Sequence, residues 1–327
     1  MQKRQLGQGG PMVGAVALGT MNFCGTYGET TQPEALRCMA ECLELGVDHF
    51  DTSNVYGMGR SEELLSIFLK DHRNRVVLAS KCGITRNPAH PFDNSPDHIR
   101  QALDASLQRL GVDHIDLYYL HRHEVARPIE EVMEVLLQLR DEGKIGAVGL
   151  SEVSPATLER ARTVGPVAAV QSEYSLWTRQ VELGVLQATM RDDTALVAFS
   201  PVGRGVLSDA IPDPETFADK DLRKGMPRFS PENWPHNLTR LRAFQDFARE
   251  IGHDPASVAI AWVLSRGPNV IALPGSRSAA HMRANALGAS LRMTSDQMAR
   301  IDEILPVGWA HGARYGAAMS VGPQPYC

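Results

Sequence analysis

The 327-residue chain has little of what is typical of secreted, disulfide-linked or membrane-spanning proteins. Its few cysteines are Cys24, Cys38, Cys42, Cys82 and Cys327. An odd number of cysteines without a C-x-x-C pair favours reduced thiols over a disulfide framework. No uninterrupted apolar run could span a bilayer, and residues 1–6 lead into glycines instead of an apolar signal segment. We therefore expect a cytoplasmic protein that does not act in a membrane.

The chain also lacks a concentration of charge and a linker. Its formal net charge is -5 and its Lys and Arg residues are scattered, which argues against nucleic acid or an anionic membrane as the partner. No Ser/Gly tract, low-complexity run or midpoint change of composition divides the sequence. We expect residues 1–327 to form one domain, since a β/α barrel takes roughly 250 residues before insertions. The expected partner is a small molecule, and the oligomeric state stays open.

A metal site has weak support. Cys38 and Cys42 lie four residues apart on a helical pattern, so they share one face of a helix. A metal pair is conceivable there, but neither a histidine nor a second cysteine pair stands at ligand spacing. Core packing is the better interpretation, and we expect no metal.

What the chain does contain is a set of short apolar runs that end abruptly at a polar residue. The clearest are 47–50 before Asp51, 76–80 before Lys81 and 115–120 before His121. Near-continuous apolar strands alternating with amphipathic helices indicate parallel β/α units, because such a sheet is covered on both faces. In a closed barrel the carboxyl ends of different strands converge on one mouth. We therefore expect these three residues and Tyr56 to meet there.

Eight strand candidates support a (β/α)8 TIM barrel. They cover residues 17–20, 47–50, 76–80, 115–120, 147–150, 168–171, 196–199 and 270–273. An opening stretch from Gln5 to Val16, broken by Gly9-Gly10-Pro11, predicts an N-terminal β-hairpin.

Helix starts agree with this alternation. Ser95-Pro96, Ser154-Pro155 and Asp254-Pro255 each place a capping oxygen before a proline, and Thr294 with Gln297 forms a capping box. Two segments escape the pattern, a long loop at 206–237 and an irregular tail at 306–327. Long loops at a barrel mouth usually serve binding. Candidates for a substrate wall are Phe23, Trp177 and Trp309.

The four polar residues suit the reduction of a carbonyl. When a carbonyl carbon receives a hydride, charge develops on its oxygen and a proton must arrive there, which Tyr56 could supply. A free phenol has a pKa of about 10, and a nearby ammonium such as Lys81 would lower it. Asp51 would keep a buried Lys81 charged. His121 could donate to the substrate oxygen and orient it.

Each residue taken singly has a simpler interpretation. Asp51 could start a loop or cap a helix, and Lys81 could extend to solvent. Tyr56 could be a rim aromatic, and His121 could belong to a solvated loop. The joint pattern favours an active site.

Together these residues resemble the signature of the aldo-keto reductase family, in that family's order and spacing. The matching segments are Asp51-Thr52-Ser53-Asn54-Val55-Tyr56-Gly57, Ser61-Glu62, Ser80-Lys81, Asp116-Leu117-Tyr118-Tyr119-Leu120-His121, Gly143-Lys144-Ile145, Gly149-Leu150-Ser151, Gln171-Ser172-Glu173-Tyr174-Ser175, Phe199-Ser200-Pro201-Val202-Gly203-Arg204-Gly205 and Pro274-Gly275-Ser276-Arg277. The resemblance runs from about Leu6 to about Gly288 and leaves the tail unmatched.

The resemblance implies a TIM barrel that binds NADPH/NADP+ without a Rossmann domain and reduces aldehydes or ketones to alcohols. The absence of a G-x-G-x-x-G after a strand agrees with this. By position, Tyr56 would be the general acid, with Lys81 and Asp51 as its tuning pair. His121 would be the orienting donor.

The resemblance also implies a cofactor site. Ser151 and Gln171 would hold the nicotinamide carboxamide, and Phe199 would stack on the ring. Ser276 and Arg277 would meet the adenosine 2'-phosphate, where an arginine fork favours NADPH over NADH. Phe199 could instead be packed at its strand end, and Arg277 could be solvated. The full set is Gly19, Thr20, Met21, Asp51, Ser151, Glu152, Gln171, Phe199, Ser200, Pro201, Gly203, Arg204, Gly275, Ser276, Arg277, His281 and Asn285.

The chain departs from the family pattern beside this set. Glu152 stands where many members carry Asn, and its carboxylate could accept from the amide. His281 stands where many members place a basic residue, and Ala284 where they place an acid. Discrimination between NADPH and NADH is therefore less defined than cofactor binding.

Three other functions stay open. His121-x-His123, with Lys81 as a modified ligand, would suit a metal-dependent hydrolase, but no further His and Asp converge at later strand ends. A Schiff-base aldolase could use Lys81. A regulatory or sensing subunit could bind NADPH through the same residues, and only turnover separates it from an enzyme.

Overall fold

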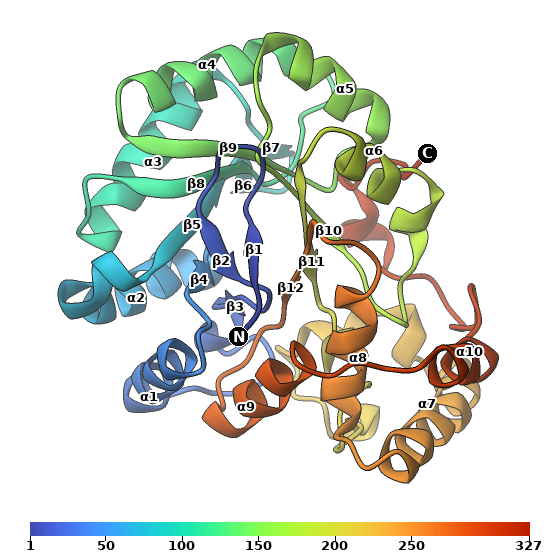
Figure 1. The fold of residues 1–327 in the computed structure, drawn as a ribbon. Helices are drawn as coiled ribbons and strands as arrows, with labels where there is room; N and C mark the ends of the chain where they lie inside the picture. The colour runs from blue at the N-terminus through green and yellow to red at the C-terminus, as the bar shows by residue number, and fades with distance from the viewer.

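Eight parallel strands form the core of the computed structural model, which describes the backbone of residues 1–327 and every side chain except that of Arg86 (Figure 1). In sheet order they are β3 (Leu18–Gly19), β4 (His49–Asp51), β5 (Val77–Cys82), β8 (Ile115–Leu120), β9 (Ile145–Ser151), β10 (Ala169–Glu173), β11 (Ala195–Phe199) and β12 (Val270–Leu273). Main-chain hydrogen bonds from Ala17 to Ala272 (2.8 Å) and from Gly19 to Pro274 (3.0 Å) join the first strand to the last. The expected TIM barrel is confirmed.

The register of these strands sets the positions of the polar residues. Asp51 pairs with Ala79, and Ala79 pairs with Leu117. Ala79 and Leu117 belong to the apolar cluster inside the barrel. Because alternate residues of a strand face opposite sides, Lys81 faces the same interior, one step closer to the mouth. The strand ends therefore bring their polar side chains to one level.

Ten helices accompany the strands, and Figure 1 shows them around the barrel. They are α1 (Gln32–Glu44), α2 (Arg60–His72), α3 (Pro96–Leu110), α4 (Ile129–Asp141), α5 (Pro155–Val164), α6 (Val185–Arg191), α7 (Trp234–Glu250), α8 (Pro255–Leu264), α9 (Ala279–Gly288) and α10 (Ser295–Ile304). The side chains of Ser95, Ser154 and Asp254 cap α3, α5 and α8 as the sequence predicts. Thr294 and Gln297 form the expected capping box.

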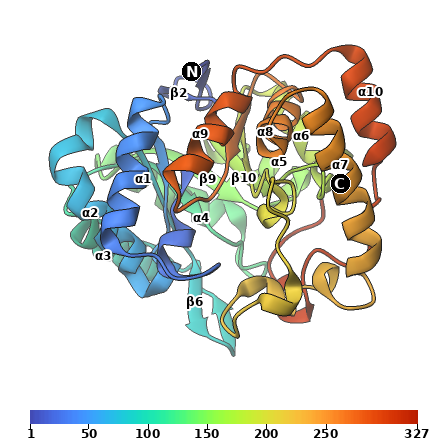
Figure 2. The same ribbon diagram turned by 90° about the horizontal axis from the view of Figure 1, so that it is seen from below.

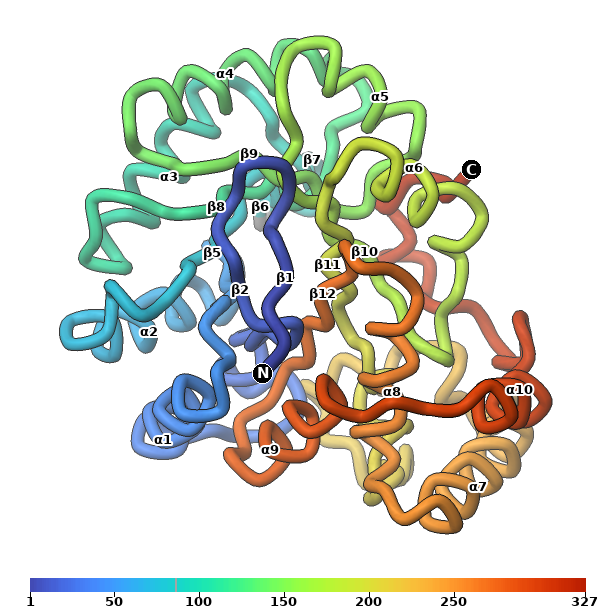
Figure 3. The backbone as a smooth tube through the Cα atoms, in the orientation of Figure 1, coloured from blue at the N-terminus to red at the C-terminus, as the bar shows by residue number. Residues whose placement is uncertain are grey.

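The N-terminal hairpin closes one end of the barrel. Strands β1 (Lys3–Gln5) and β2 (Met12–Gly14) pair antiparallel, and Figure 3 follows the hairpin across that end. Leu6 and Val13 are fully buried in the interior apolar cluster. Arg4 donates to the main-chain oxygens of Gly267 (2.7 Å) and Leu264 (2.8 Å), which ties the hairpin to the end of α8 and the turn that follows it. A cavity can therefore open only at the other end.

The opposite end carries the irregular segments (Figure 2). An additional hairpin of β6 (Ile84–Asn87) and β7 (His90–Phe92) follows β5 there, which the sequence did not predict. The segment expected as a loop at 206–237 contains short 3-10 turns, and α7 begins inside it at Trp234. The tail after Leu305 has one short turn, η9 (Ala317–Ser320).

The remaining expectations concern cysteines and membranes. Cys38 and Cys42 are fully buried in the apolar core on α1, as the core-packing interpretation required. All five cysteines are free thiols. None of the described helices combines the length and apolar character needed to cross a bilayer.

Candidate active site

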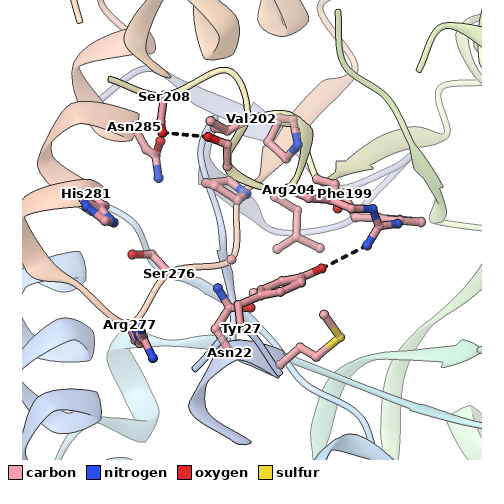
Figure 4. Close-up of a pocket in the computed structure, with 18 of the residues that line it drawn as sticks. Asn22, Tyr27, Phe199, Val202, Arg204, Ser208, Ser276, Arg277, His281 and Asn285 are labelled. Carbon is pink, nitrogen blue, oxygen red and sulfur yellow. Dashed lines mark hydrogen bonds between the residues drawn. The ribbon is translucent and has the colours of Figure 1, made fainter. Parts of the chain in front are cut away.

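A cavity of about 730 Å³ opens at the barrel mouth. Its inner end lies over the barrel and is lined by strand-end residues, namely Asp51, Tyr56, His121, Ser151 and Gln171. Its outer end lies beside the starts of α8 and α9 and is lined by Asp254, Ser276, Arg277, His281 and Asn285. Figure 4 shows Ser276, Arg277, His281 and Asn285 on one side of the cavity, across from Phe199 and Arg204.

Lys81 is the centre of the inner end. Its fully buried ammonium forms an ion pair with Asp51 and donates to the Thr52 carbonyl at 2.8 Å. It also donates to the Tyr56 hydroxyl at 3.2 Å. Asp51 accepts a further hydrogen bond from the Gln171 amide at 2.8 Å. These contacts fix the phenol oxygen against a buried cation.

Burial and neighbouring charges shift the pKa values of Lys81 and Tyr56 in opposite directions. Burial favours a neutral Lys81, but the charge of Asp51, the neighbouring Tyr56 oxygen and the hydrogen bonds to both together outweigh burial and raise the pKa of the ammonium above its ordinary value. Burial raises the pKa of Tyr56, and the charge of Lys81 acts the other way without reversing that rise. Lys81 therefore works in the expected direction, but the net pKa shift of Tyr56 is upward. Tyr56 is held as a protonated phenol, which is the donor form.

His121 supplies a second donor. Its Nδ1 lies 3.1 Å from the Ser53 hydroxyl, and its ring meets the Tyr56 ring edge-on at a centroid distance of 5.9 Å. Burial, the Arg122 charge and the Lys81 charge hold the pKa of His121 well below its usual range. The imidazole is therefore neutral near pH 7, and one of its two ring nitrogens carries a hydrogen.

The turn that carries Tyr56 depends on a glycine. Tyr56 begins the short turn η2 (Tyr56–Gly59), in which Gly57 has a positive φ of 55°. A Cβ at Gly57 would lie 2.5 Å from the sulfur of Cys24. Only glycine allows the backbone to pass this close, so Gly57 lets the turn place the phenol over the barrel.

Three further side chains form the wall of the inner end. Ser151 ends β9, Gln171 pairs with it from β10, and Phe199 ends β11. All three line the cavity, and Phe199 is only half-buried, so part of its ring is open to the cavity. A ring beside a hydroxyl and an amide suits a planar aromatic amide ligand.

Glu152 differs from the expectation. Its side chain does not line the cavity but is buried beneath the tail, where it forms an ion pair with Arg314. Tyr326 donates to the same carboxylate at 3.2 Å, and the carboxylate accepts from the Glu173 main-chain N–H at 3.0 Å. Glu152 therefore anchors the tail, and its carboxylate is not available to a nicotinamide amide in this arrangement.

The outer end has the character of an anion site. Ser276 and Arg277 precede α9, whose first turn is capped by the Ser278 side chain. The start of a helix carries partial positive charge, which adds to the Arg277 guanidinium. Arg277 donates to the Glu29 carbonyl and packs on Gly28, whose φ of 114° and close approach to the guanidinium require glycine. The Arg277 guanidinium is on an exposed side chain, unlike the donors of the inner end, whereas Ser276 is buried.

A bridge that the sequence did not predict crosses the cavity. Tyr27 accepts a hydrogen bond from Arg204 at 3.0 Å (Figure 4). The Arg223 guanidinium lies over the Tyr27 ring, 4.9 Å from its centroid. Leu222 donates from its main-chain N–H to Thr26 at 3.4 Å. The loop after β3 is thus joined to the segment after β11. No sequence spacing signals this contact, because both partners lie on loops.

Most of the proposed cofactor residues line the cavity. Those that do not are Thr20, Glu152 and Gly203. The hydroxyl of Thr20 is bound to the Asp51 carbonyl at 2.9 Å and lies below the cavity floor. The expected substrate wall is not found, since Phe23, Trp177 and Trp309 are buried and pack in the core. Tyr27, Tyr315 and Met319 line the cavity instead.

The alternatives based on metal and on a Schiff base gain nothing from the geometry. No cluster of three potential metal-binding side chains occurs among the residues that the structure describes. The imidazole Nε2 of His123 bonds to the Arg127 carbonyl at 2.8 Å, and its Nδ1 faces Gln324 at 2.9 Å. His123 therefore points away from a ligand shared with His121.

Comparison with known proteins covers nearly the whole chain. The model of the aldo/keto reductase family matches residues 15–306. A relative from Schizosaccharomyces pombe, aldo-keto reductase yakc [NADP(+)], is 33% identical over 315 residues, covering 94% of this chain and 93% of the relative.

Solved structures give the same result. The glycerol dehydrogenase AKR11B4 from Gluconobacter oxydans superposes with a TM-score of 0.81 at 30% identity, covering 90% of this chain and 92% of that one. The holo form of aldo-keto reductase AKR11C1 from Bacillus halodurans superposes with a TM-score of 0.76 at 26% identity, covering 97% and 99%.

Proposed function

The chain belongs to the aldo/keto reductase family, and from this premise we propose that it is an NADPH-dependent oxidoreductase that reduces aldehydes or ketones to alcohols, with Tyr56 as the general acid. The observation that supports the role of Tyr56 is the hydrogen bond from the buried Lys81 ammonium to its hydroxyl at 3.2 Å. A phenol at the floor of an open cavity, beside a fixed cation, is suited to protonate a substrate oxygen.

The residues present fit NADPH. Ser151 and Gln171 stand ready for the carboxamide at the inner end, beside the open face of Phe199. Ser276 and Arg277 provide hydroxyl, guanidinium and helix-start donors for a phosphate at the outer end. When bound, the cofactor supplies the hydride.

The side chains of the inner end supply the proton and position the substrate carbonyl. Tyr56 donates the proton to the carbonyl oxygen as charge develops there. Lys81 stabilises the phenolate that is left, and Asp51 keeps Lys81 charged within the barrel. The neutral His121, which lines the cavity beside Tyr56, donates a ring N–H to the carbonyl oxygen and orients it. The bridge of Tyr27 and Arg204 shields the cavity between its two ends.

We extend the proposal to the setting of the enzyme. Residues 1–327 form one domain, supported by a barrel whose hairpin, long segment and tail all bond to it. The free thiols favour a reducing compartment, namely the cytoplasm. The substrate is a small carbonyl compound, in keeping with the size of the cavity.

The test is the rate of NADPH oxidation with a panel of aromatic and aliphatic aldehydes, for the wild type and Tyr56→Phe, with and without chelator. Tyr56→Phe should bind NADPH as the wild type does and lose about a hundredfold or more in kcat, because only the proton is removed. Full activity in that variant would contradict the role of Tyr56. Tight NADPH binding without any turnover by the wild type would instead favour a sensing subunit.

A further inference from the structure

Arg122 is a cation at the inner end of the cavity that no carboxylate neutralises. It follows His121 directly, lines the cavity and is half-buried. Among the described residues, none of the ion pairs of the protein includes Arg122. An arginine beside the reacting groups with its charge unmatched is unusual, since buried charges are normally paired.

The cations nearest the reacting groups, other than Arg122, are matched. Lys81 pairs with Asp51. Of the arginines that line the cavity away from its outer end, Arg204 pairs with Glu173 and Arg223 with Asp221. The inner end without ligands therefore carries an excess of positive charge, and Arg122 is its source.

One nitrogen of the Arg122 guanidinium is hydrogen-bonded within the protein, and the other two are free among the described residues. Its Nη1 donates to the His121 carbonyl at 2.6 Å and to the Ser151 hydroxyl at 3.1 Å. Its main-chain oxygen accepts from Asn94 at 3.2 Å. Within the described part of the chain, Nε and Nη2 have no hydrogen-bond partner and are not sealed from solvent. These donors are available to a ligand in the cavity.

The outer end offers a comparison within the same cavity. Arg277 also lacks a carboxylate partner in the described structure, and its one protein acceptor is the Glu29 carbonyl. At that end the proposed 2'-phosphate would neutralise the positive charge of Arg277. Arg122 stands at the opposite end, beyond the reach of that phosphate, so its counter-ion must come from another molecule.

We propose that Arg122 recognises a carboxylate on the substrate, and that the preferred substrates are aldehydes or ketones that carry one. This inference rests on the proposed function, because it places the carbonyl at Tyr56 and His121. A planar guanidinium with two free donors matches a carboxylate bidentately. The uncompensated charge also attracts anions into the cavity, more strongly at low ionic strength.

The reaction remains a simple carbonyl reduction. The hydride forms a C–H bond to the carbonyl carbon, the C=O π bond opens onto oxygen, and Tyr56 delivers the proton. The product is a hydroxycarboxylate, NADPH is oxidised to NADP+, and the carboxylate bound by Arg122 is unchanged.

The hydrogen bond to Ser151 does not by itself explain why an arginine stands at position 122. A lysine or a glutamine could donate the single hydrogen bond at 3.1 Å to that hydroxyl without bringing a fork to the cavity. If Arg122 served only Ser151, its loss would weaken NADPH binding and would affect every carbonyl substrate alike. The two roles therefore predict different results.

The experiment compares matched substrate pairs. We would measure kcat/KM for 4-carboxybenzaldehyde against 4-methylbenzaldehyde, and for 4-oxobutanoate against butanal. The ratio within each pair, acid over neutral, is compared between wild type and variant, so that intrinsic differences in carbonyl reactivity cancel. Arg122→Met, which keeps length and loses charge, should lower both ratios by about tenfold to a hundredfold. Arg122→Lys should fall in between.

The control is Arg300→Met, which removes the same charge from the exposed surface of α10 outside the cavity. Its ratios should equal those of the wild type. Added salt should raise the KM of the acids more than that of the neutral aldehydes.

Two outcomes separate failure of this inference from failure of the proposed function. Tyr56-dependent turnover with ratios that stay equal in wild type and Arg122→Met would overturn the role of Arg122 alone. If no aldehyde is turned over, calorimetric binding of 4-hydroxymethylbenzoate to the protein with NADP+ still tests it. Equal Kd values in wild type, Arg122→Met and Arg122→Lys would then reject carboxylate recognition, whereas weaker binding by Arg122→Met would support it.

Discussion

The two ends of the cavity are built in different ways. At the inner end, Asp51 and Lys81 are buried on strands and bonded to each other before any ligand arrives. At the outer end, Arg277 and His281 are exposed on a loop and at the start of a helix. The group of Asp51, Lys81 and Tyr56 is assembled without a ligand, whereas the outer end needs a ligand to balance the charge of Arg277.

This difference matches the demands on each end. A proton donor must be held in place by groups that do not rearrange during the reaction, which strands and buried ion pairs provide. A cofactor that enters and leaves in each catalytic cycle needs donors that can be reached from solvent. We therefore expect changes at the inner end to alter rate and stability, and changes at the outer end to alter affinity.

The largest effect is expected from Lys81→Met. It removes the cation that stabilises the Tyr56 phenolate, so kcat should fall about a thousandfold, or about 4 kcal/mol in activation free energy. Because Lys81 does not line the cavity, the Kd for NADPH, measured by fluorescence titration, should stay close to the wild-type value. Lys144→Met is the matched control, because it removes a partly exposed lysine that pairs with Asp104 away from the cavity. A variant with near-normal kcat would show that the inner end does not depend on its ion pair.

The next largest effect is expected on stability, and it tests whether the tail is firmly bound to the inner end through Arg314. Arg314→Met leaves the buried Glu152 carboxylate without its cation, which should lower the free energy of unfolding by about 3 kcal/mol. The double variant Arg314→Met with Glu152→Gln removes both charges and should recover most of that loss in urea titrations. If the single variant were as stable as the wild type, the tail would be only loosely attached to the barrel.

The sequence predicted the inner end better than the loops. Asp51, Lys81 and His121 stand at or just past strand ends, and the strand period and register decide where such residues point. Local pattern was enough to predict that they converge. The barrel and the helix caps follow from equally local signals.

Apart from the local hairpin of β6 and β7 and the start of α7, the failures involve contacts between segments that are distant in the chain. Glu152 has a positive φ of 55° and turns to Arg314, a residue of the tail that no local pattern links to it. Trp177 and Trp309 pack on each other in the core, where their apolar surface is better buried than at a cavity wall. Arg122 and Tyr27 were missed because only three-dimensional neighbours show that one lacks a counter-ion and the other bridges the mouth.

A smaller effect is expected at the outer end. Arg277→Ala removes the exposed guanidinium, so the Kd for NADPH should rise about tenfold, or about 1.4 kcal/mol. The Kd for NADH should change little, because NADH lacks the 2'-phosphate, and kcat at saturating NADPH should be retained. Arg283→Ala serves as the control, because Arg283 is an exposed arginine on the helix α9 that follows Arg277, and it pairs with Glu41. An equal rise in the Kd values of NADPH and NADH would show that Arg277 does not bind the 2'-phosphate.

The smallest expected effect is that of pH on kcat, which depends on the inner end of the cavity. Burial, with help from Arg122 and Lys81, keeps the pKa of His121 well below its usual range, and burial keeps the pKa of Tyr56 above its ordinary value. Both groups then hold one protonation state from about pH 6.5 to about pH 9, so kcat for a neutral aldehyde should vary by less than about twofold there. Reduction uses the protonated Tyr56, so the rate should fall only when pH rises above the ordinary phenol value of about 10.

At the outer end the 2'-phosphate itself titrates, with a second ionisation near about pH 6. NADPH binding should therefore weaken as pH falls below that value, because the phosphate loses charge opposite Arg277, while NADH binding should not respond. Steady-state assays at saturating NADPH, beside fluorescence titrations of both cofactors across the same pH range, measure the two ends independently. A kcat that followed the same pH curve as the NADPH Kd would mean that the ends are coupled, and that the inner end is not complete before the cofactor binds.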